Sequence, residues 1–278
     1  MRVSSLVICC LFATVVPAHA GETAWQELAP GVQLRLISSG TVDAAGSALF
    51  ALEIDMPDTT KTYWRVPGET GLPIDLDFGS SVGISGYEIH WPMPTREAGK
   101  GVLDYVYYGH TILPIELDVG DPHGIVDVTA TLGICSEICI PAQARLTLPA
   151  SDGDADGGNA LRIRQAMAQV PIAWDQGAEP AGAVRIAEDG AAIVVEVDPS
   201  VVDPASLIVA GDLEAPLFGA PQKSPQDDLV VLPIVGKTID SALEGMEVEL
   251  SFMTPMGAYE VSRTIETGGD VAANDSGH

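Results

Sequence analysis

The residues best suited to chemistry are Cys135 and Cys139, which enclose Ser136-Glu137-Ile138. On one continuous strand these cysteines would share a face but lie about 13 Å apart, at ~3.3 Å per residue, which is too far for a disulfide. A hairpin that turns at residues 136–138 removes the obstacle, because it places the cysteines opposite each other on adjacent strands. The spacing therefore predicts strands over 125–134 and 139–148 that meet at the cysteine pair.

A disulfide between Cys135 and Cys139 has three possible uses. Closing so short a loop stabilises a fold by about 2 kcal/mol, a modest gain for a structural bond. The spacing also excludes the wide inter-sheet disulfide of immunoglobulin domains. A short bond in an exposed turn is typical of labile or catalytic disulfides, so we favour a redox role. A structural bond and a thiolate metal site remain as alternatives.

The sequence around the pair does not indicate an activated thiolate. Glu137 lies between the cysteines, and the nearest basic residue in the chain is Arg145. A neighbouring carboxylate disfavours the thiolate, so neither thiol should be strongly acidic unless a distant residue folds toward it. Such a pair suits a thiol that receives electrons from a partner better than a free-standing oxidant.

The other two cysteines, Cys9 and Cys10, lie in an apolar run near the start of the chain. Arg2 precedes this run, and Ala18-His19-Ala20 supplies small residues at a cleavage position. This layout predicts a secretory signal peptide over residues 1–20 and a periplasmic protein without a membrane span. Cys135 and Cys139 would then work in an oxidising compartment.

The charge balance excludes one large class of partner. The chain has 13 Lys and Arg residues against 39 Asp and Glu residues, a formal net charge of −26. A nucleic-acid-binding protein needs a basic surface, so nucleic acid is not an expected partner. Anionic lipid is disfavoured for the same reason.

The hydrophobic pattern predicts an all-β protein of two tandem immunoglobulin-like sandwiches. The first series of candidate strands covers 32–37, 48–54, 84–91, 111–117 and 125–132. The second series covers 191–197, 207–210, 229–235, 246–252 and 259–265. We expect a first domain over 21–150, a linker with a short helix over 151–181, a second domain over 182–266 and a disordered tail over 267–278.

Several motifs resemble the periplasmic N-terminal domain of the DsbD/ScsB thiol:disulfide interchange family. They are the segments 135–142 (CSEICIPA), 145–148 (RLTL), 63–73 (YWRVPGETGLP), 90–94 (HWPMP) and 107–109 (YYG), with Leu113-Pro114. Together they span about 36–148. The second β series is similar to the additional sandwich of ScsB-type proteins, with weaker motifs.

This resemblance implies an immunoglobulin-like fold and thiol–disulfide exchange, with Cys135 and Cys139 as the redox pair and no cofactor. It also implies a protein-disulfide reductase component whose partners are periplasmic thioredoxin-like or disulfide isomerase proteins. The electron donor would be a separately encoded membrane protein, because this chain shows no multi-helix membrane domain. Tyr63 and Trp64 are expected near the cysteines, where a cap loop shields the pair in family members.

Two other readings come from different function classes. The methionines of Met253-Thr254-Pro255-Met256 could bind Cu(I), which would make the chain a copper-tolerance module. The second alternative is a non-catalytic tandem immunoglobulin-like adaptor, in which the cysteines are incidental. The scattered His90, His110 and His123 do not form a recognisable metal motif. Trp64 and Trp91 are expected in the core of the first sandwich.

Overall fold

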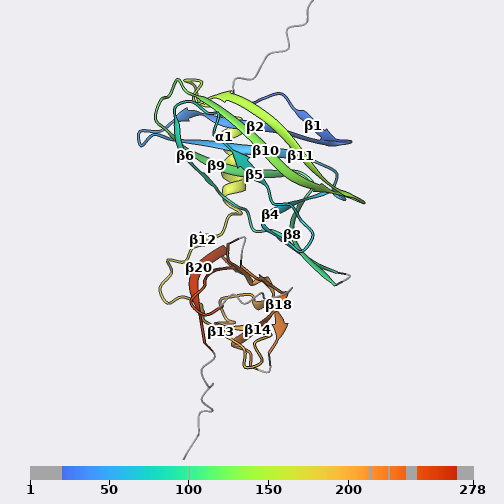
Figure 1. Cartoon of the computed structure of the whole chain (residues 1–278). Coiled ribbons are helices and arrows are strands. Elements are labelled where there is room, and N and C mark those ends of the chain that lie inside the picture. Colours follow the sequence, from blue (N-terminus) through green and yellow to red (C-terminus); the bar gives the residue numbers. More distant parts are fainter. Residues whose placement is uncertain (1–20, 100, 213–214, 225, 236–242, 268–278) are drawn as a thin grey trace, which may run out of the picture.

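The computed structural model describes residues 21–99, 101–212, 215–224, 226–235 and 243–267. The signal peptide predicted over 1–20 and most of the tail predicted over 267–278 lie outside these residues. The described chain is built almost entirely of strands, which form two β-sandwiches, so the predicted all-β immunoglobulin-like fold is confirmed. The first sandwich lies at the top of Figure 1 and the second below it.

The first sandwich consists of two antiparallel sheets. One has the order β1-β2-β3-β9-β6, from β1 (Gln26–Ala29), β2 (Val32–Val42), β3 (Ser47–Asp55), β9 (Thr111–Val119) and β6 (Ile84–Ile89). The other has the order β11-β10-β4-β8-β7, from β11 (Cys139–Pro149), β10 (Ile125–Cys135), β4 (Lys61–Gly68), β8 (Val102–Tyr108) and β7 (Thr95–Gly99), with β5 (Asp75–Asp77) on β10.

The core of this sandwich follows from the two-residue period of its strands. Alternate residues of β10 point inward and are buried, namely Val126, Val128, Ala130, Leu132 and Ile134. They meet the inward residues of β2, β3 and β9 from the opposite sheet. Because side chains alternate across a sheet, the intervening residues of β10 face outward, and Cys135 is one of them.

Helix α1 (Gly157–Met167) packs on the outside of the five-stranded sheet. It lies within the predicted linker and begins at Gly157, where the Asp156 side chain caps it by accepting from the amide of Asn159. Ile163 is buried against Ile37 and Ala51 of the sheet. The acidic run before the helix is also attached to the sheet, since the amide of Asp156 donates to the carbonyl of Ser39.

The second sandwich has its strands in the order β15-β19-β20-β13-β14-β18-β16, with β12 and β17 at the side. The bounds are β12 (Ile172–Ala173), β13 (Ala181–Ile186), β14 (Ala192–Val197), β15 (Ile208–Ala210), β16 (Leu217–Phe218), β17 (Gln222–Lys223), β18 (Leu229–Val235), β19 (Glu247–Thr254) and β20 (Gly257–Glu266), with a 3₁₀ turn at Pro204–Ser206. Its core centres on Leu232, Leu250 and Phe252.

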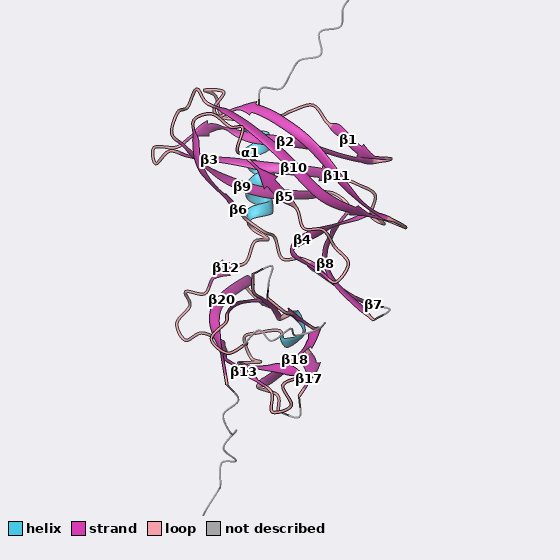
Figure 2. Ribbon diagram, viewed as in Figure 1, coloured by secondary structure: helices cyan, strands magenta, loops and turns pink. Residues whose placement is uncertain are grey.

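The two sandwiches contact each other through β4, β7 and β8. Figure 2 shows β7 and β8 extending from the upper sandwich beside the lower one. Trp64 and Tyr105 pack with Ile208 and Ala210 of the second sandwich. Trp64 therefore lies in the cluster between the sandwiches, which corrects its expected place in the core of the first. Arg96 of β7 adds to the contact by donating to the carbonyl of Ala205 at 2.7 Å.

Candidate redox site at the cysteine hairpin

The predicted hairpin is present, and the cysteines close it. β10 and β11 pair in one unbroken register from Ile125 opposite Pro149 to Cys135 opposite Cys139. The Cα atoms of the two cysteines are 4.1 Å apart, and their sulfur atoms are joined by a disulfide. The turn contains Ser136, and the outer face of the sheet carries the bond. The residue types and their spacing in this short segment were therefore sufficient to predict that Cys135 and Cys139 meet across a hairpin.

The two sulfur atoms have different surroundings. Cys135 is 2% exposed and packs with Tyr63 and Val106, whereas Cys139 is exposed. The Tyr63 hydroxyl donates to the sulfur of Cys135 at 2.8 Å, and it lies 3.5 Å from the sulfur of Cys139. An attacking thiolate can therefore reach Cys139, while a tyrosine hydroxyl is in place to stabilise negative charge on Cys135.

The segment 69–73 covers Tyr63. A Cβ atom added to Gly71 would collide with the Tyr63 ring, so only glycine allows this close passage. On the other side, a Cβ atom at Gly133 would lie 3.1 Å from that of Leu72 and 3.2 Å from the Tyr63 ring. Because Gly71 and Gly133 have no side chains, the covering segment, Tyr63 and the hairpin can pack together.

A buried carboxylate fixes the covering segment to the sheet. Asp104, which is 3% exposed, accepts from the amide of Thr70 at 3.1 Å and from its hydroxyl at 2.6 Å. The amide of Leu103 donates to the Glu69 carboxylate at 2.7 Å. Segment 69–73 is consequently held at its start by β8, the strand that also supplies Val106 beneath the disulfide.

A lysine lies next to the buried cysteine. Lys61 pairs with Cys135 in the β4–β10 register, and its ammonium is 5.6 Å from the centre of the Tyr63 ring. The Lys61 ammonium binds Glu97 at 2.5 Å and Asp104 at 3.2 Å. Burial alone would lower the pKa of Lys61, but these two carboxylates outweigh it and hold the pKa above its ordinary value. The positive charge beside the disulfide is therefore already neutralised.

Sequence reasoning did not find Lys61, Glu97 or Asp104. The candidate strands included none of β4, β7 and β8, and Pro67 and Gly68 interrupt the strand pattern only at the end of β4. The expectation that a distant basic residue could fold toward the cysteines is met by Lys61, 74 positions before Cys135 in the numbering of the chain. The consecutive β-branched and aromatic residues Thr62, Tyr63 and Trp64, which favour strands, were the available signal.

The surface around Cys139 is partly apolar. Ile138 is 75% exposed at the turn, and Ile140 is also exposed on β11. Leu72 of the covering segment and Tyr108 of β8 are further exposed large side chains on this part of the sandwich. The Tyr108 hydroxyl donates to Glu97, so the apolar surface has an acidic neighbour.

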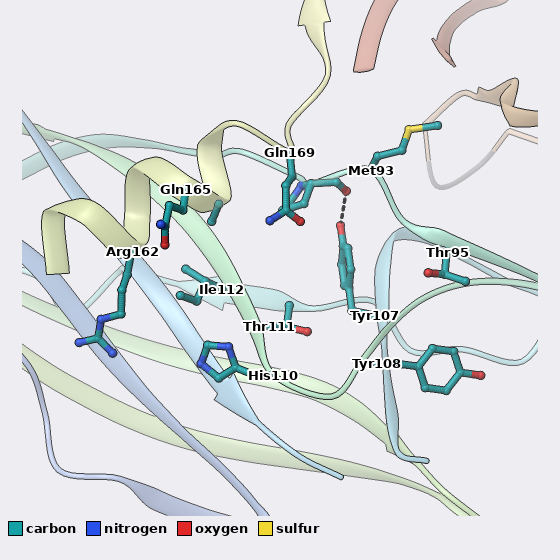
Figure 3. Close-up of a pocket in the computed structure, with 12 residues that line it drawn as sticks. Met93, Thr95, Tyr107, Tyr108, His110, Thr111, Ile112, Arg162, Gln165 and Gln169 are labelled. Carbon is teal, nitrogen blue, oxygen red and sulfur yellow. Dashed lines mark hydrogen bonds between the residues drawn. The ribbon is translucent and has the colours of Figure 1, made fainter. Parts of the chain in front are cut away.

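A pocket of about 520 Å³ lies between α1 and the β8–β9 turn (Figure 3). Its most polar side chains are already paired, since Arg162 binds Glu53 at 2.8 Å and His110 binds the same carboxylate at 2.9 Å. Figure 3 also shows the Tyr107 hydroxyl donating to the carbonyl of Pro92. The pocket contains no cysteine, so it is separate from the candidate redox chemistry.

A second cavity, of about 500 Å³, lies at the junction of the sandwiches. Arg65 from β4 binds Glu249 of β19 there. Burial and the neighbouring Glu249 carboxylate raise the pKa of Glu260 to about 7. The unpaired indole nitrogen of Trp64 belongs to a residue that lines this cavity.

The histidines and methionines highlighted by the sequence do not gather at the cysteines. His90 lies near Glu88 and Glu116, and His110 binds Glu53. Met253 and Met256 are exposed at the β19–β20 turn of the second sandwich. In the described part of the chain, no three His, Cys, Asp or Glu side chains are grouped so that they could hold a metal ion. Within that part, no helix has the length and apolar character needed to cross a membrane.

Comparison with known proteins agrees with the fold and the hairpin. Residues 36–151 match the family model described as thiol:disulfide interchange protein DsbD, N-terminal. No curated protein matches the chain. The solved N-terminal periplasmic domain of ScsB from Proteus mirabilis superimposes with a TM-score of 0.72 at 22% identity, covering 90% of this chain and 100% of that one.

Other solved structures share far less. The human Desmocollin-1 ectodomain has a TM-score of 0.21 at 6% identity, covering 80% of this chain and 44% of that one. A chimeric titin Z1Z2 has a TM-score of 0.19 at 10% identity, covering 91% and 100%. These likenesses are too weak to argue from. The family model, together with the cysteine hairpin and the arrangement of sheets around it, places the first sandwich over residues 36–151 in the family of the DsbD N-terminal domain.

Proposed function

We propose that this protein carries reducing equivalents between periplasmic and membrane partners through the Cys135–Cys139 pair. The observation that carries the proposal is the asymmetry of the disulfide, with Cys139 exposed and Cys135 buried under the Tyr63 hydroxyl. The family match and the signal peptide expected over 1–20 support a periplasmic setting. The unit expected over 21–150 carries the exchange in this proposal.

The exchange begins at Cys139. A thiolate of a reduced partner attacks the Cys139 sulfur and forms a mixed disulfide, while the electron pair of the broken bond leaves on Cys135 as a thiolate. The Tyr63 hydroxyl, 2.8 Å away, donates a hydrogen bond to that thiolate. The partner's second thiolate then attacks the partner's first sulfur in the mixed disulfide, and Cys139 leaves as a thiolate. The protein ends as a dithiol and the partner as a disulfide.

The surrounding charges suit a carrier of electrons in both directions. Lys61 lies opposite Cys135 on the neighbouring strand, and Glu97 and Asp104 both pair with its ammonium. Its stabilisation of a thiolate is therefore reduced, so the dithiol is not strongly favoured over the disulfide. The reverse of the first exchange then delivers electrons to an oxidised partner.

The proposed circuit has two kinds of partner. A membrane-embedded protein, encoded separately, would reduce Cys139, and periplasmic thioredoxin-like or disulfide isomerase proteins would receive the electrons. In this circuit the chain acts as a component of a protein-disulfide reductase. No specific contact in the described residues favours copper binding or a purely structural adaptor as a second function.

Trapping of mixed disulfides tests the proposal. With Cys135→Ala, the free Cys139 should form a stable mixed disulfide with a thioredoxin-like protein, detectable by mass spectrometry under non-reducing conditions. The matched Cys139→Ala variant keeps a buried thiol and should trap much less. Equal trapping by both variants would contradict attack at Cys139. A reduction potential well below about −300 mV, with no trapped species, would instead indicate an inert structural disulfide.

A further inference from the structure

Strand β11 lies at the edge of its sheet and includes Cys139. On one side, β11 pairs with β10 along its whole length. In the described ranges, no strand pairs with its other side. On that side, the side-chain amide of Gln26 in β1 donates to the carbonyl of Arg145 at 2.8 Å. An edge strand with unpaired backbone groups can accept another strand.

The prolines of β11 show which backbone groups face this free edge. Pro141 lies opposite Gly133 and Pro149 opposite Ile125, and proline has no N–H to exchange with β10. These positions must therefore belong to the non-hydrogen-bonded pairs of the antiparallel ladder, whose N–H and C=O groups point away from the partner strand. Proline in edge strands is normally confined to such positions.

Cys139 falls in the same alternate set as Pro141. The 4.1 Å between the Cα atoms of Cys139 and Cys135 is typical of a non-hydrogen-bonded pair, which averages ~4.5 Å rather than ~5.5 Å. On β10, the backbone N–H and C=O of Cys135 correspondingly point toward β4, where Cys135 lies opposite Lys61. The Arg145 carbonyl, also in this set, is the one reached by Gln26 from outside. The backbone N–H and C=O of Cys139 therefore point to the open edge.

From this we infer that partners dock by adding an extended segment to the β11 edge, with their backbone paired directly to Cys139. The inference rests on the proposed exchange function and specifies how the partner is recognised. The occupant is a thiol-bearing partner protein, because the exposed sulfur and the free backbone groups belong to the same residue. Backbone pairing reads no side-chain sequence, so it accommodates several partners.

The edge also limits how far the added strand pairs. The next outward position is Pro141, which offers a carbonyl but no N–H. Pairing is therefore concentrated at Cys139, and the exposed Ile138 and Ile140 contribute apolar contact on either side. A short pairing gives a transient complex, which an electron carrier needs in order to release each partner.

The test uses a defined probe on the full chain. A capped hexapeptide of Thr and Val with one Cys, activated as a mixed disulfide with thionitrobenzoate, is mixed with the reduced Cys135→Ala variant. The Cys139 thiolate attacks the peptide sulfur, forms a protein–peptide disulfide and releases thionitrobenzoate, whose absorbance gives the rate. A series of peptides carries one N-methyl group at each successive residue, which removes one backbone donor at a time.

Strand addition predicts an alternating result. N-methylation at the residues that face β11 should slow the reaction roughly tenfold, and N-methylation at the intervening residues should leave it unchanged. Equal rates for the whole series would overturn the docking inference. Failure of Cys139 to react with every peptide, the unmethylated one included, would instead count against the proposed exchange function, so the two failures are distinguishable.

A pair of proline substitutions provides a matched control. Pro141→Ala restores an outward N–H beside Cys139 and should speed the reaction with the unmethylated peptide roughly threefold to tenfold. Pro149→Ala restores an outward N–H on the same edge about 33 Å from Cys139, at ~3.3 Å per residue, and should have no effect on the rate. An equal response of both variants would overturn the inference. Concentration-dependent dimerisation of the unmodified chain through β11, measured by sedimentation, would also overturn it by identifying a second copy as the occupant.

Discussion

Neighbouring residues of strands β4 and β8 point to opposite faces of the sheet, and these two faces differ in character. The outer face presents Lys61, Tyr63 and Val106 to the disulfide. The inner face presents Trp64 and Tyr105, whose rings meet edge to face with centroids 5.7 Å apart, to the second sandwich. One residue step along β4 therefore separates a reactive surface from a sealed one.

This difference shows how the fold combines stability with chemistry. The inner face is apolar and buried between two sandwiches, so it contributes free energy of folding. The outer face buries a polar network of Lys61, Asp104 and Tyr63 around one sulfur atom while leaving the other exposed. We therefore expect substitutions on the inner face to change stability, and those on the outer face to change reactivity.

The largest expected effect is on the inner face. Trp64→Ala removes a side chain that is 2% exposed and should lower the free energy of unfolding by about 3–5 kcal/mol. Urea unfolding measures the loss, and Trp25→Ala, at a half-buried position against Arg35, should cost much less. The rate of disulfide reduction by dithiothreitol in the folded protein should stay within about twofold. A tenfold change in that rate would show that the faces are not independent.

The next effect is on the outer face. Tyr63→Phe removes the hydroxyl that donates to Cys135 and should slow reduction of the disulfide by dithiothreitol roughly tenfold, because the leaving thiolate loses a hydrogen bond. Tyr108→Phe is the matched control, since its hydroxyl donates to Glu97 instead of to sulfur. Similar slowing in both variants would assign the effect to general electrostatics of the outer face.

The smallest effect concerns the pH dependence of the junction between the sandwiches. The folded protein holds the Glu260 proton up to about pH 7, above the ordinary pKa of 4.5. The stabilisation from this proton is complete below pH 4.5 and is lost as the pH rises through 7. Glu260→Gln has no such proton to lose, so at pH 8 it should be more stable than the unmodified chain by on the order of 1 kcal/mol, after allowance for solvent screening.

Thermal unfolding between pH 4 and pH 8 measures this difference. Glu247→Gln, which changes an exposed carboxylate on β19, serves as the control and should follow the unmodified chain. A stability gap between Glu260→Gln and the unmodified chain that is constant over the whole pH range would contradict titration of Glu260 as the cause.

The sequence predicted the local part of the site and missed the distant part. Strands such as β2 and β9 follow a clear two-residue period, and the Cys135–Cys139 spacing favours a hairpin by geometry alone. β4 and β8 escaped notice because Pro67 and Gly68 interrupt the pattern in one, and the consecutive residues Leu103 to Tyr107 are all buried in the other. A strand covered on both sides loses the alternation that reveals it.

By itself, the sequence determined that two cysteines would meet across a tight turn in an all-β protein, since turn length and strand period are local properties of the chain. The tertiary structure alone decided that Tyr63 reaches Cys135, that Lys61 lies beside it already neutralised, and that Cys139 stays exposed. The contacts of Tyr63 and Lys61 with Cys135 join residues more than 70 positions apart. They depend on the order and register of strands in the sheet, which are fixed by packing of the whole core rather than by any short segment.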